Sequence, residues 1–207
     1  VSISGALDVG SDGGRRKFGA SGPSAILAAN HNRSAPASKT HTRRAAGSTL
    51  PTFKPMPDQM TTRDDALQRA SRIKLMIFDV DGVLTDGALF FNHNGEEFKA
   101  FNALDGHGMR MLRESGVRLA IITGRKASCV EWRMKNLRID LLLQGVDNKL
   151  AALKGLLEEL GLTPEEAGFM GDDVIDLQVM DHCGFSAAPA NAHALAKQYA
   201  RLVTERT

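Results

Sequence analysis

Two aspartates stand at the end of the first strand that the sequence predicts. Asp79 and Asp81 follow an apolar run at residues 73–78 and begin the stretch DVDGVLTDG. Side chains at positions i and i+2 of an extended chain point to the same side, so we expect the two carboxylates to converge at the carboxyl end of a sheet. A hard cation such as Mg²⁺ would offset their repulsion, leaving one acid to attack a substrate and the other to transfer protons. An isolated pair of this kind is more often a strand-end turn, so the rest of the chain decides between the two interpretations.

A threonine, a lysine and a second group of acids follow later strands. Thr123 and Gly124 can offer a hydroxyl group and a close backbone approach to a phosphate oxygen, although an ordinary strand-to-helix turn is the commoner explanation of such a pair. Lys149 lies in the first turn of a predicted helix, where its charge opposes the helix dipole unless a phosphate is bound beside it. The stretch GDDVID at residues 171–176 holds three acids, which is more than a helix cap requires.

The elements that position these residues alternate between strands and helices. The apolar pattern predicts strands at residues 73–78, 118–122, 140–143, 168–170, 184–187 and 201–203, and helices at residues 63–71, 107–115, 126–137, 148–160, 173–182 and 192–199. This alternation predicts an α/β fold with a doubly wound, mostly parallel, Rossmann-like sheet. Residues 88–91 and 96–101 break it. They flank an Asn-Gly pair at residues 94–95, which predicts a β-hairpin flap after the first strand.

Composition limits what the chain can be. Its 207 residues, 43% hydrophobic and 24% charged, suit one globular domain, which we place at residues 61–207. Residues 1–60 have no helical or alternating pattern, and we interpret them as a disordered leader or a mis-set N-terminus, with a transit peptide as the less favoured alternative.

Charge and hydropathy exclude two classes of partner. Residues 1–59 hold eight Lys or Arg and three Asp, so the rest of the chain is weakly acidic, which argues against a nucleic-acid partner. No apolar run approaches a membrane span, so we expect no membrane partner. Cys129 and Cys183 lack the spacing of a metal site; we interpret them as reduced thiols and the protein as cytoplasmic.

The ordered set DVDGVLTDG, TGR, Lys149 and GDDVID resembles the four motifs of the haloacid dehalogenase superfamily. The resemblance covers about residues 70–204. It implies that Asp79 is the nucleophile of a phosphatase, that Asp81 is the general acid and base, and that Thr123 and Lys149 hold the phosphoryl group. It also implies a Mg²⁺ cofactor bound by Asp79, the carbonyl group of Asp81 and Asp172, with Asp173 in a second layer behind them.

The spacing of these motifs leaves no room for a cap domain. Asp79 and Thr123 are 44 residues apart, and Thr123 and Lys149 are 26 residues apart. The open site therefore serves a large substrate or is closed by a neighbouring subunit. Residues 94–102, 105–108, 121–126 and 145–149 resemble the family of 3-deoxy-D-manno-octulosonate 8-phosphate phosphatases. That resemblance implies a small phosphorylated sugar acid as substrate, a homotetramer in which a neighbour completes the active site, and a role in lipopolysaccharide biosynthesis.

The same resemblance implies a set of substrate contacts. These are Asp81, Asn102, Ala103, Leu104, Asp105, Gly106, Arg110, Gly124, Arg125, Arg133 and Lys149. Several arginines suit a ligand with a carboxylate and a phosphate, although a solvated helix face is the commoner fate of a lone arginine such as Arg110 or Arg133.

Two departures from that family keep alternatives open. Leu104 stands where many members carry an arginine, and the sequence ends at Thr207, so we interpret the family's C-terminal tail as missing. A phosphatase for a related nine-carbon sugar acid and a non-catalytic assembly module remain as alternatives. A signalling receiver domain is disfavoured because its acid pair precedes the phosphoacceptor, whereas Asp172 and Asp173 come last here.

Overall fold

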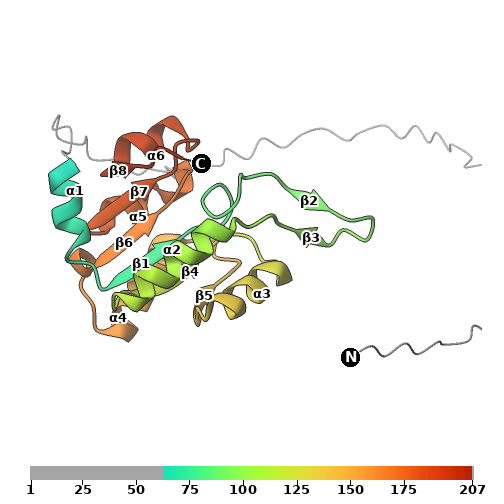
Figure 1. The fold of residues 1–207 in the computed structure, drawn as a ribbon, viewed down its shortest axis with the longest axis horizontal. Helices are drawn as coiled ribbons and strands as arrows, with labels where there is room; N and C mark the ends of the chain where they lie inside the picture. Colours follow the sequence, from blue (N-terminus) through green and yellow to red (C-terminus); the bar gives the residue numbers. More distant parts are fainter. Residues whose placement is uncertain (1–62, 207) are drawn as a thin grey trace, which may run out of the picture. The chain divides into compact units, whose positions relative to one another are not determined.

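Six parallel strands form the central sheet of the computed structural model, which describes residues 63–206 (Figure 1). The strands are β1 (Leu75–Phe78), β4 (Arg118–Ile122), β5 (Leu141–Leu143), β6 (Ala167–Met170), β7 (Phe185–Ala188) and β8 (Leu202–Val203). Their order is β5-β4-β1-β6-β7-β8, which confirms the predicted doubly wound parallel sheet. The chain runs outward from β1 in both directions. The carboxyl ends of β1 and β6 therefore form the switch point at which open α/β sheets bind ligands.

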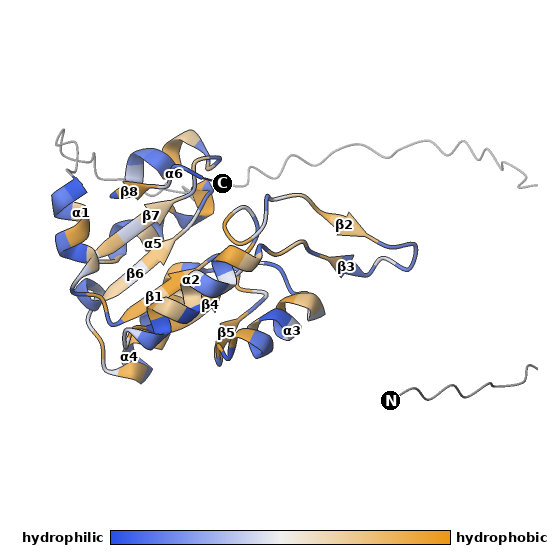
Figure 2. Ribbon diagram, in the orientation of Figure 1, coloured by the Kyte–Doolittle hydropathy of each residue, from blue (hydrophilic) through white to orange (hydrophobic). Residues whose placement is uncertain are grey.

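Helices cover both faces of this sheet. They are α1 (Arg63–Ala70), α2 (Ala103–Glu114), α3 (Ser128–Leu137), α4 (Lys149–Leu160), α5 (Leu177–His182) and α6 (Ala194–Tyr199), with short 3₁₀ turns η1 (Pro164–Glu166) and η2 (Val174–Asp176). One buried apolar cluster joins the sheet to α4, α5 and α6, and a second joins it to α1, α2 and α3. Both faces of β1, β4 and β5 are covered, and these strands are hydrophobic except for the exposed Arg118 at the start of β4 (Figure 2). None of the helices within residues 63–206 is long and apolar enough to cross a membrane.

The predicted hairpin is present between β1 and α2. Its strands are β2 (Phe90–Phe91) and β3 (Glu97–Phe98), paired antiparallel and extending away from the sheet (Figure 1). The side chain of Asn92 accepts the N–H groups of Asn94 and Glu96, and this fixes the turn. Within residues 63–206 the hairpin and α2 fill the segment between β1 and β4, which confirms the absence of a cap domain there. The prediction of a leader at residues 1–60 lies outside the described residues.

Several helix boundaries differ from the predictions, among them the start of α6, which lies at Ala194 rather than at residue 192. Helix α2 begins at Ala103 rather than at residue 107, because the Asn102 side chain caps it by accepting the N–H group of Leu104 at 2.9 Å. Helix α3 begins at Ser128 rather than at residue 126, because Ala127 is extended, with φ −145° and ψ 135°; its N–H group bonds to the side chain of Gln144. The helix predicted at residues 173–182 is divided into η2 and α5, and η1 was not predicted.

Candidate active site

A cavity of about 290 Å³ opens where the loops after β1, β4 and β6 meet. Each loop leaves the carboxyl end of a parallel strand, so residues far apart in the sequence come together at the switch point. The cavity is lined by Asp79, Asp81, Gly87, Leu89, Thr123, Gly124, Arg125, Asp172, Asp173 and Ile175. The structure therefore brings together most of the residues that the sequence predicts as catalytic or metal-binding.

Lys149 lies behind this cavity and is almost fully buried. Its ammonium group is 2.7 Å from Asp79 Oδ2 and 2.7 Å from Asp176 Oδ1. Burial lowers the pKa of Lys149, but the two carboxylates outweigh burial and the pKa is raised above its ordinary value. The lysine is therefore positively charged, and the two acids stabilise a cation in the first turn of α4 even without a bound phosphate.

One carboxylate oxygen of Asp79 forms an ion pair, and the other has no partner among residues 63–206. Oδ2 binds Lys149, whereas Oδ1 is buried and has no hydrogen-bond partner among residues 63–206. Burial raises the pKa of Asp79, Asp176 raises it further, and Lys149 opposes both effects. Buried polar atoms normally have partners, so an unpartnered oxygen at the edge of a cavity indicates a place where a ligand or reactant binds.

Asp172 completes a cluster of three acids. Asp79, Asp172 and Asp176 each offer a carboxylate oxygen, and these oxygens lie within 4.8 Å of one another. Burial and the charges of Asp176 and Asp79 raise the pKa of Asp172 to about 7. A divalent cation with oxygen ligands would relieve this repulsion, so the residues present fit the predicted Mg²⁺.

Gly82 leaves the space that Asp172 occupies. Its φ is +85°, and a Cβ atom at this position would lie 2.0 Å from Asp172 Oδ2. The loop after β1 therefore needs glycine here for two reasons, the left-handed backbone and the close approach of the carboxylate. The DVDG stretch thus shapes the metal-binding side of the cavity as well as supplying acids to it.

Asp176 has a structural task that the sequence did not assign. It is fully buried, and its Oδ2 accepts the N–H groups of Asp172 at 3.0 Å and Asp173 at 3.2 Å, while its Oδ1 binds Lys149. Both oxygens are engaged, so Asp176 is placed as a support for the loop after β6 rather than as a metal ligand. The third acid of GDDVID was the only signal for it in the sequence.

Asp173 is exposed and acts as the N-cap of η2. Its Oδ1 accepts the N–H group of Val174 at 2.7 Å. The capping interpretation of one acid in this stretch therefore holds for Asp173. Its role in a second layer around the metal stays a prediction.

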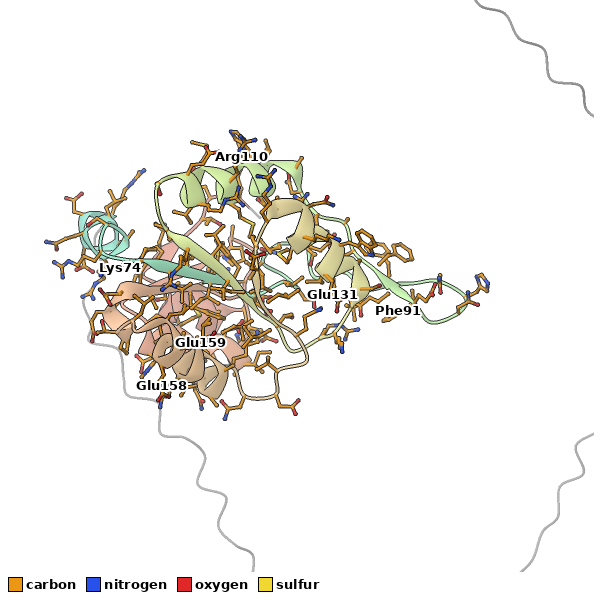
Figure 3. The ribbon with its side chains drawn as sticks, turned by 90° about the horizontal axis from the view of Figure 1, so that it is seen from below. Lys74, Phe91, Arg110, Glu131, Glu158 and Glu159 are labelled. Atoms are coloured by element: carbon orange, nitrogen blue, oxygen red, sulfur yellow. The ribbon has the colours of Figure 1, made fainter. Side chains whose placement is uncertain are left out.

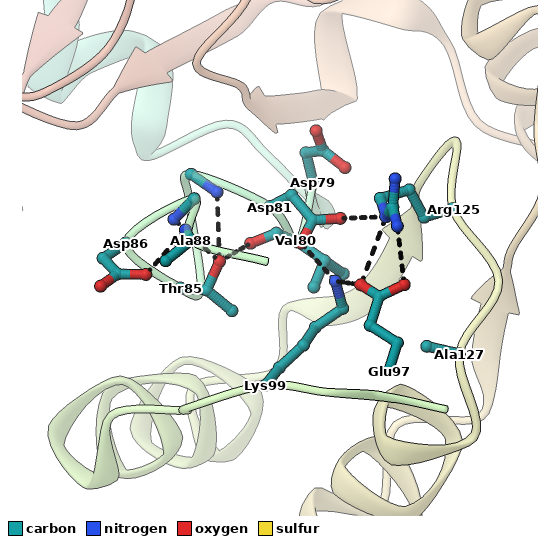
Figure 4. Close-up of polar contacts among 12 residues, drawn as sticks. Asp79, Val80, Asp81, Thr85, Asp86, Ala88, Glu97, Lys99, Arg125 and Ala127 are labelled. Carbon is teal, nitrogen blue, oxygen red and sulfur yellow. Dashed lines mark hydrogen bonds and ion pairs between the residues drawn. The ribbon is translucent and has the colours of Figure 1, made fainter. Parts of the chain in front are cut away.

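The hairpin brings two charged residues, Glu97 and Lys99, against Arg125 and Asp81, which line the cavity. Lys99 binds Asp81 Oδ1 and Glu97 Oε1 through its ammonium group. Arg125 donates two hydrogen bonds to Glu97, at 2.8 Å and 3.2 Å, and its Nε lies 3.9 Å from Asp81 Oδ2 (Figure 4). Burial lowers the pKa of Lys99, but hydrogen bonds with Asp81 and Glu97 outweigh it, so the pKa is raised.

Glu97 and Lys99 are not among the site residues predicted from the sequence. They stand two positions apart on an extended segment, so their side chains share one side of it. That pattern predicts that Glu97 and Lys99 lie together, but it does not predict that Lys99 binds Asp81. Only the tertiary position of the hairpin supplies that information.

Other predicted substrate contacts lie around the start of α2, outside this cavity. Arg133 Nη2 donates to the carbonyl group of Asn102 at 2.9 Å, and its guanidinium group lies 5.7 Å from the centre of the Phe101 ring. Gly106 makes room for it, because a Cβ atom there would lie 2.5 Å from Arg133 Nη2. Asn102, Leu104 and Asp105 line a separate concavity of about 350 Å³. Arg133 is therefore bound in the protein and is not a freely solvated side chain.

Ala103 and Arg110 are two further predicted contacts that do not line the cavity. Ala103 is the exposed first residue of α2. Arg110 lies on the outer side of α2 and pairs with Glu114 at 2.8 Å (Figure 3). Neither lines the cavity that Asp79 lines. Their predicted contact with substrate stays a prediction.

Comparison with known proteins places the chain among phosphatases. Residues 130–207 match a family described as haloacid dehalogenase-like hydrolase. The chain is 49% identical over 140 residues to the 3-deoxy-D-manno-octulosonate 8-phosphate phosphatase of Escherichia coli (strain K12), a match that covers 68% of this chain and 74% of that protein.

Solved structures give the same result. The crystal structure of the Yersinia pestis enzyme of that name matches with a TM-score of 0.67 and 47% identity, covering 69% of this chain and 77% of the other. The Moraxella catarrhalis enzyme, solved with a magnesium ion, a phosphate ion and a KDO molecule, matches with a TM-score of 0.68 and 39% identity, covering 70% and 83%.

Proposed function

This chain belongs to the haloacid dehalogenase-like hydrolases and, within them, to the family of the 3-deoxy-D-manno-octulosonate 8-phosphate phosphatases, and we propose that it hydrolyses that sugar acid phosphate through an aspartyl-phosphate. It is a phosphomonoester hydrolase, as its relatives are. The observation that carries the proposed mechanism is the buried Asp79, which has Oδ2 bound by Lys149 and Oδ1 without a partner among residues 63–206.

In the proposed first step, Asp79 Oδ1 attacks the phosphorus atom of the substrate. An acyl phosphate forms, the bond from phosphorus to the sugar oxygen breaks, and Asp81 gives a proton to the departing sugar oxygen. In the second step Asp81 takes a proton from a water molecule, which attacks the phosphorus atom and releases Asp79. Asp79 and Asp81 both line the cavity, and this arrangement supports the division of roles.

Positive charge and hydrogen-bond donors stabilise the transferred group. Lys149, held 2.7 Å from Asp79 Oδ2, neutralises part of the charge on the phosphoryl oxygens, and the Thr123 hydroxyl group and the Gly124 N–H group bind them. Asp79, Asp172 and the carbonyl group of Asp81 would hold Mg²⁺, which would supply further positive charge for the transferred group. Asp173 supports this set from the exposed side of the loop.

The sugar acid part of the substrate binds beyond the phosphate in this proposal. Arg125 lines the cavity beside Asp81 and its guanidinium group is suited to a carboxylate. Asn102, Ala103, Leu104, Asp105, Gly106, Arg110 and Arg133 are the further contacts that we propose. Because several of them lie outside the cavity of one chain, we also propose a homotetramer in which a neighbouring subunit completes the site.

The proposed substrate also suggests the compartment and the pathway in which the enzyme acts. We propose that the enzyme acts in the cytoplasm, in lipopolysaccharide biosynthesis. Leu104 leaves one alternative substrate open. Its side chain is 67% exposed at the start of α2, where many family members carry an arginine, so a related nine-carbon sugar acid phosphate is the second candidate.

A panel of phosphate esters tests the proposal. Phosphate release would be measured with the eight-carbon and nine-carbon sugar acid phosphates and with a hexose phosphate that lacks the carboxylate, each with Mg²⁺ and with EDTA. We expect the eight-carbon substrate to give the highest kcat/KM, the hexose phosphate to be poor, and EDTA to abolish all activity. Preference for the nine-carbon ester would move the assignment to the second candidate. No phosphate release from any ester with Mg²⁺ would favour a non-catalytic assembly module.

A further inference from the structure

The hairpin contacts Asp81 of the active site through a lysine whose side chain is buried. Lys99 stands 18 residues after Asp81, yet its ammonium group binds Asp81 Oδ1 (Figure 4). Its side chain is only 1% exposed, although Phe91 and Phe98 of the same hairpin are more than half exposed. The lysine is therefore turned inward from an otherwise exposed element, and the same ammonium group also binds Glu97 Oε1.

These contacts fix one oxygen of Asp81 and leave the other available. Oδ1 is held by Lys99, while the contact of Oδ2 with Arg125 Nε, at 3.9 Å, is longer than a hydrogen bond. A carboxylate that transfers a proton must present one oxygen at hydrogen-bond distance from the reacting atom. A cation that binds the opposite oxygen holds the side chain in one rotamer and provides that orientation.

Glu97 gives Lys99 its position. It accepts from Lys99 at Oε1 and from Arg125 at both oxygens, so the side chains of the hairpin and of the loop after β4 meet at one carboxylate. Without Glu97, a flexible lysine side chain on a two-stranded hairpin would lose its second anchor. The four side chains thus form a continuous chain of charges from β3 to Asp81.

We propose that Lys99 is a positioning residue that orients Asp81 for proton transfer, and that Glu97 holds Lys99 in place. This inference rests on the proposed function, in which Asp81 protonates the departing sugar oxygen. The competing explanation is that Lys99 only fastens the hairpin to the domain. The two differ in one consequence, because a fastening role affects all substrates alike, whereas an orienting role matters only where a proton must be transferred.

The test compares two leaving groups in the phosphorylation step. A sugar alkoxide needs a proton as it departs, whereas nitrophenolate departs without one. Single-turnover rates of Asp79 phosphorylation would be measured by rapid quench with the sugar acid phosphate and with nitrophenyl phosphate. We expect Lys99→Met to slow the first by roughly 10- to 100-fold and to leave the second near the wild-type rate. Glu97→Gln should show the same pattern to a smaller extent, and Lys99→Arg should restore part of the rate.

Matched controls come from the same region. Glu96→Gln changes the neighbouring acid of the hairpin, whose side chain binds Asn92, and Lys135→Met changes an exposed lysine on α3 that lies over the Trp132 ring. Both should leave the two rates unchanged. Equal slowing of both substrates by Lys99→Met and by Glu97→Gln would overturn the proposal, because it is the result that a fastening role predicts.

The Asp81→Asn variant separates failure of this inference from failure of the proposed function. If Asp81 is the proton donor, Asp81→Asn alone should slow the sugar substrate selectively, and adding Lys99→Met should cause no further loss. Additive losses would overturn the positioning role while leaving the function of Asp81 intact. If Asp81→Asn does not discriminate between the leaving groups, the proton-transfer role itself is wrong, and the positioning role falls with it.

Discussion

Lys149 balances the negative charge of the buried part of the site. It is the shared partner of Asp79 and Asp176, at 2.7 Å from each, and it lies where water cannot screen the two acids. Removing one partner of a buried ionic set leaves the others uncompensated, which costs far more than losing a surface pair. The lysine therefore serves the stability of the domain as well as the proposed binding of phosphate.

The first prediction concerns this residue. Lys149→Met should lower the free energy of unfolding of the metal-free protein by about 3–5 kcal/mol, and it should also abolish phosphate release. Urea unfolding monitored by circular dichroism measures the first effect. Lys154→Met, an exposed position on the same helix, is the control and should change stability by no more than about 0.5 kcal/mol. Equal stability of the two variants would contradict the role of the buried lysine.

A second prediction follows from Asp172, whose pKa is raised from its ordinary 3.8 to about 7. An aspartate with a raised pKa binds its proton more tightly in the folded protein than in the unfolded chain. Its contribution therefore favours folding at low pH and is lost as the pH rises through about 7. We expect the metal-free protein to have a lower Tm at about pH 8 than at about pH 6.

The Asp172→Asn variant and added Mg²⁺ separate the contribution of Asp172 to the pH dependence of Tm from the contributions of other titrating groups. Asp172→Asn should remove this part of the pH dependence, and Mg²⁺ should raise the Tm of the wild type more at the higher pH, because the ion binds the ionised carboxylate. Thermal unfolding followed by circular dichroism measures the Tm of both proteins at both pH values, with and without Mg²⁺. An unchanged pH slope in Asp172→Asn would show that the titrating group is another one.

Sequence alone located the acids but not all of their supports. Asp79 and Thr123 directly follow β1 and β4, and Asp172 comes two residues after the end of β6, so strand prediction was enough to bring them to one edge. Asp176 and Lys99 act through contacts with residues 27 and 18 positions away, and no local pattern specifies such contacts. Their positions depend on tertiary packing.

At the scale of elements, the loops after β1 and β6 fit against each other through a glycine. Gly82 has a φ of +85° and faces Asp172, so alanine there would meet the carboxylate and displace it. Gly116 has a φ of +96° but nothing within 4 Å of an added Cβ atom. An alanine at either position would have to adopt an unfavourable left-handed conformation. Only at position 82 would its Cβ atom also meet a neighbouring side chain.

The third prediction uses this pair. Gly82→Ala should raise the Mg²⁺ concentration needed for half-maximal activity by roughly 10-fold or more, since misplacing a metal-binding group or its support has effects of that size. Gly116→Ala should lose some stability and keep the wild-type requirement for metal. Activity measured against Mg²⁺ concentration provides the comparison. A similar shift in both variants would mean that backbone strain, and not the contact with Asp172, is responsible.

The sequence predicted which elements form better than it predicted where the helices begin. The strands and the hairpin followed from apolar runs and an Asn-Gly turn, which are local signals. The start of α2 was wrong by four residues because Gly106 and Gly108 disfavour helix, while the Asn102 cap and its contact with Arg133 start the helix earlier. Capping and tertiary contacts outweighed intrinsic propensity there.

At the scale of the whole molecule, an exposed apolar flap stands beside an open cavity. Phe90 and Phe98 stack with their ring centres 5.6 Å apart, and Leu89, Phe90, Phe91 and Phe98 are each more than 40% exposed. Such a patch beside an active site suits burial against another subunit. This supports the proposed homotetramer.

The fourth prediction tests that assembly. Phe91→Ser combined with Phe98→Ser should shift the protein from a tetramer to smaller species in sedimentation equilibrium and raise KM for the sugar acid phosphate. Leu67→Ser, which removes an exposed apolar residue from α1, is the control and should do neither. A wild-type protein that sediments as a monomer and is fully active would contradict the proposed completion of the site by a neighbour.

The most direct test of the central claim is to identify the residue that carries the phosphoryl group. The Asp81→Asn variant should accumulate the intermediate, because its second step lacks a base. When it is mixed with nitrophenyl phosphate, whose leaving group needs no proton, and Mg²⁺, and is then quenched in acid and digested, mass spectrometry should find one added phosphoryl group on Asp79. The same treatment of Asp79→Asn should find none and no phosphate release. A phosphoryl group on another residue, or phosphate release by Asp79→Asn at the wild-type rate, would contradict the account.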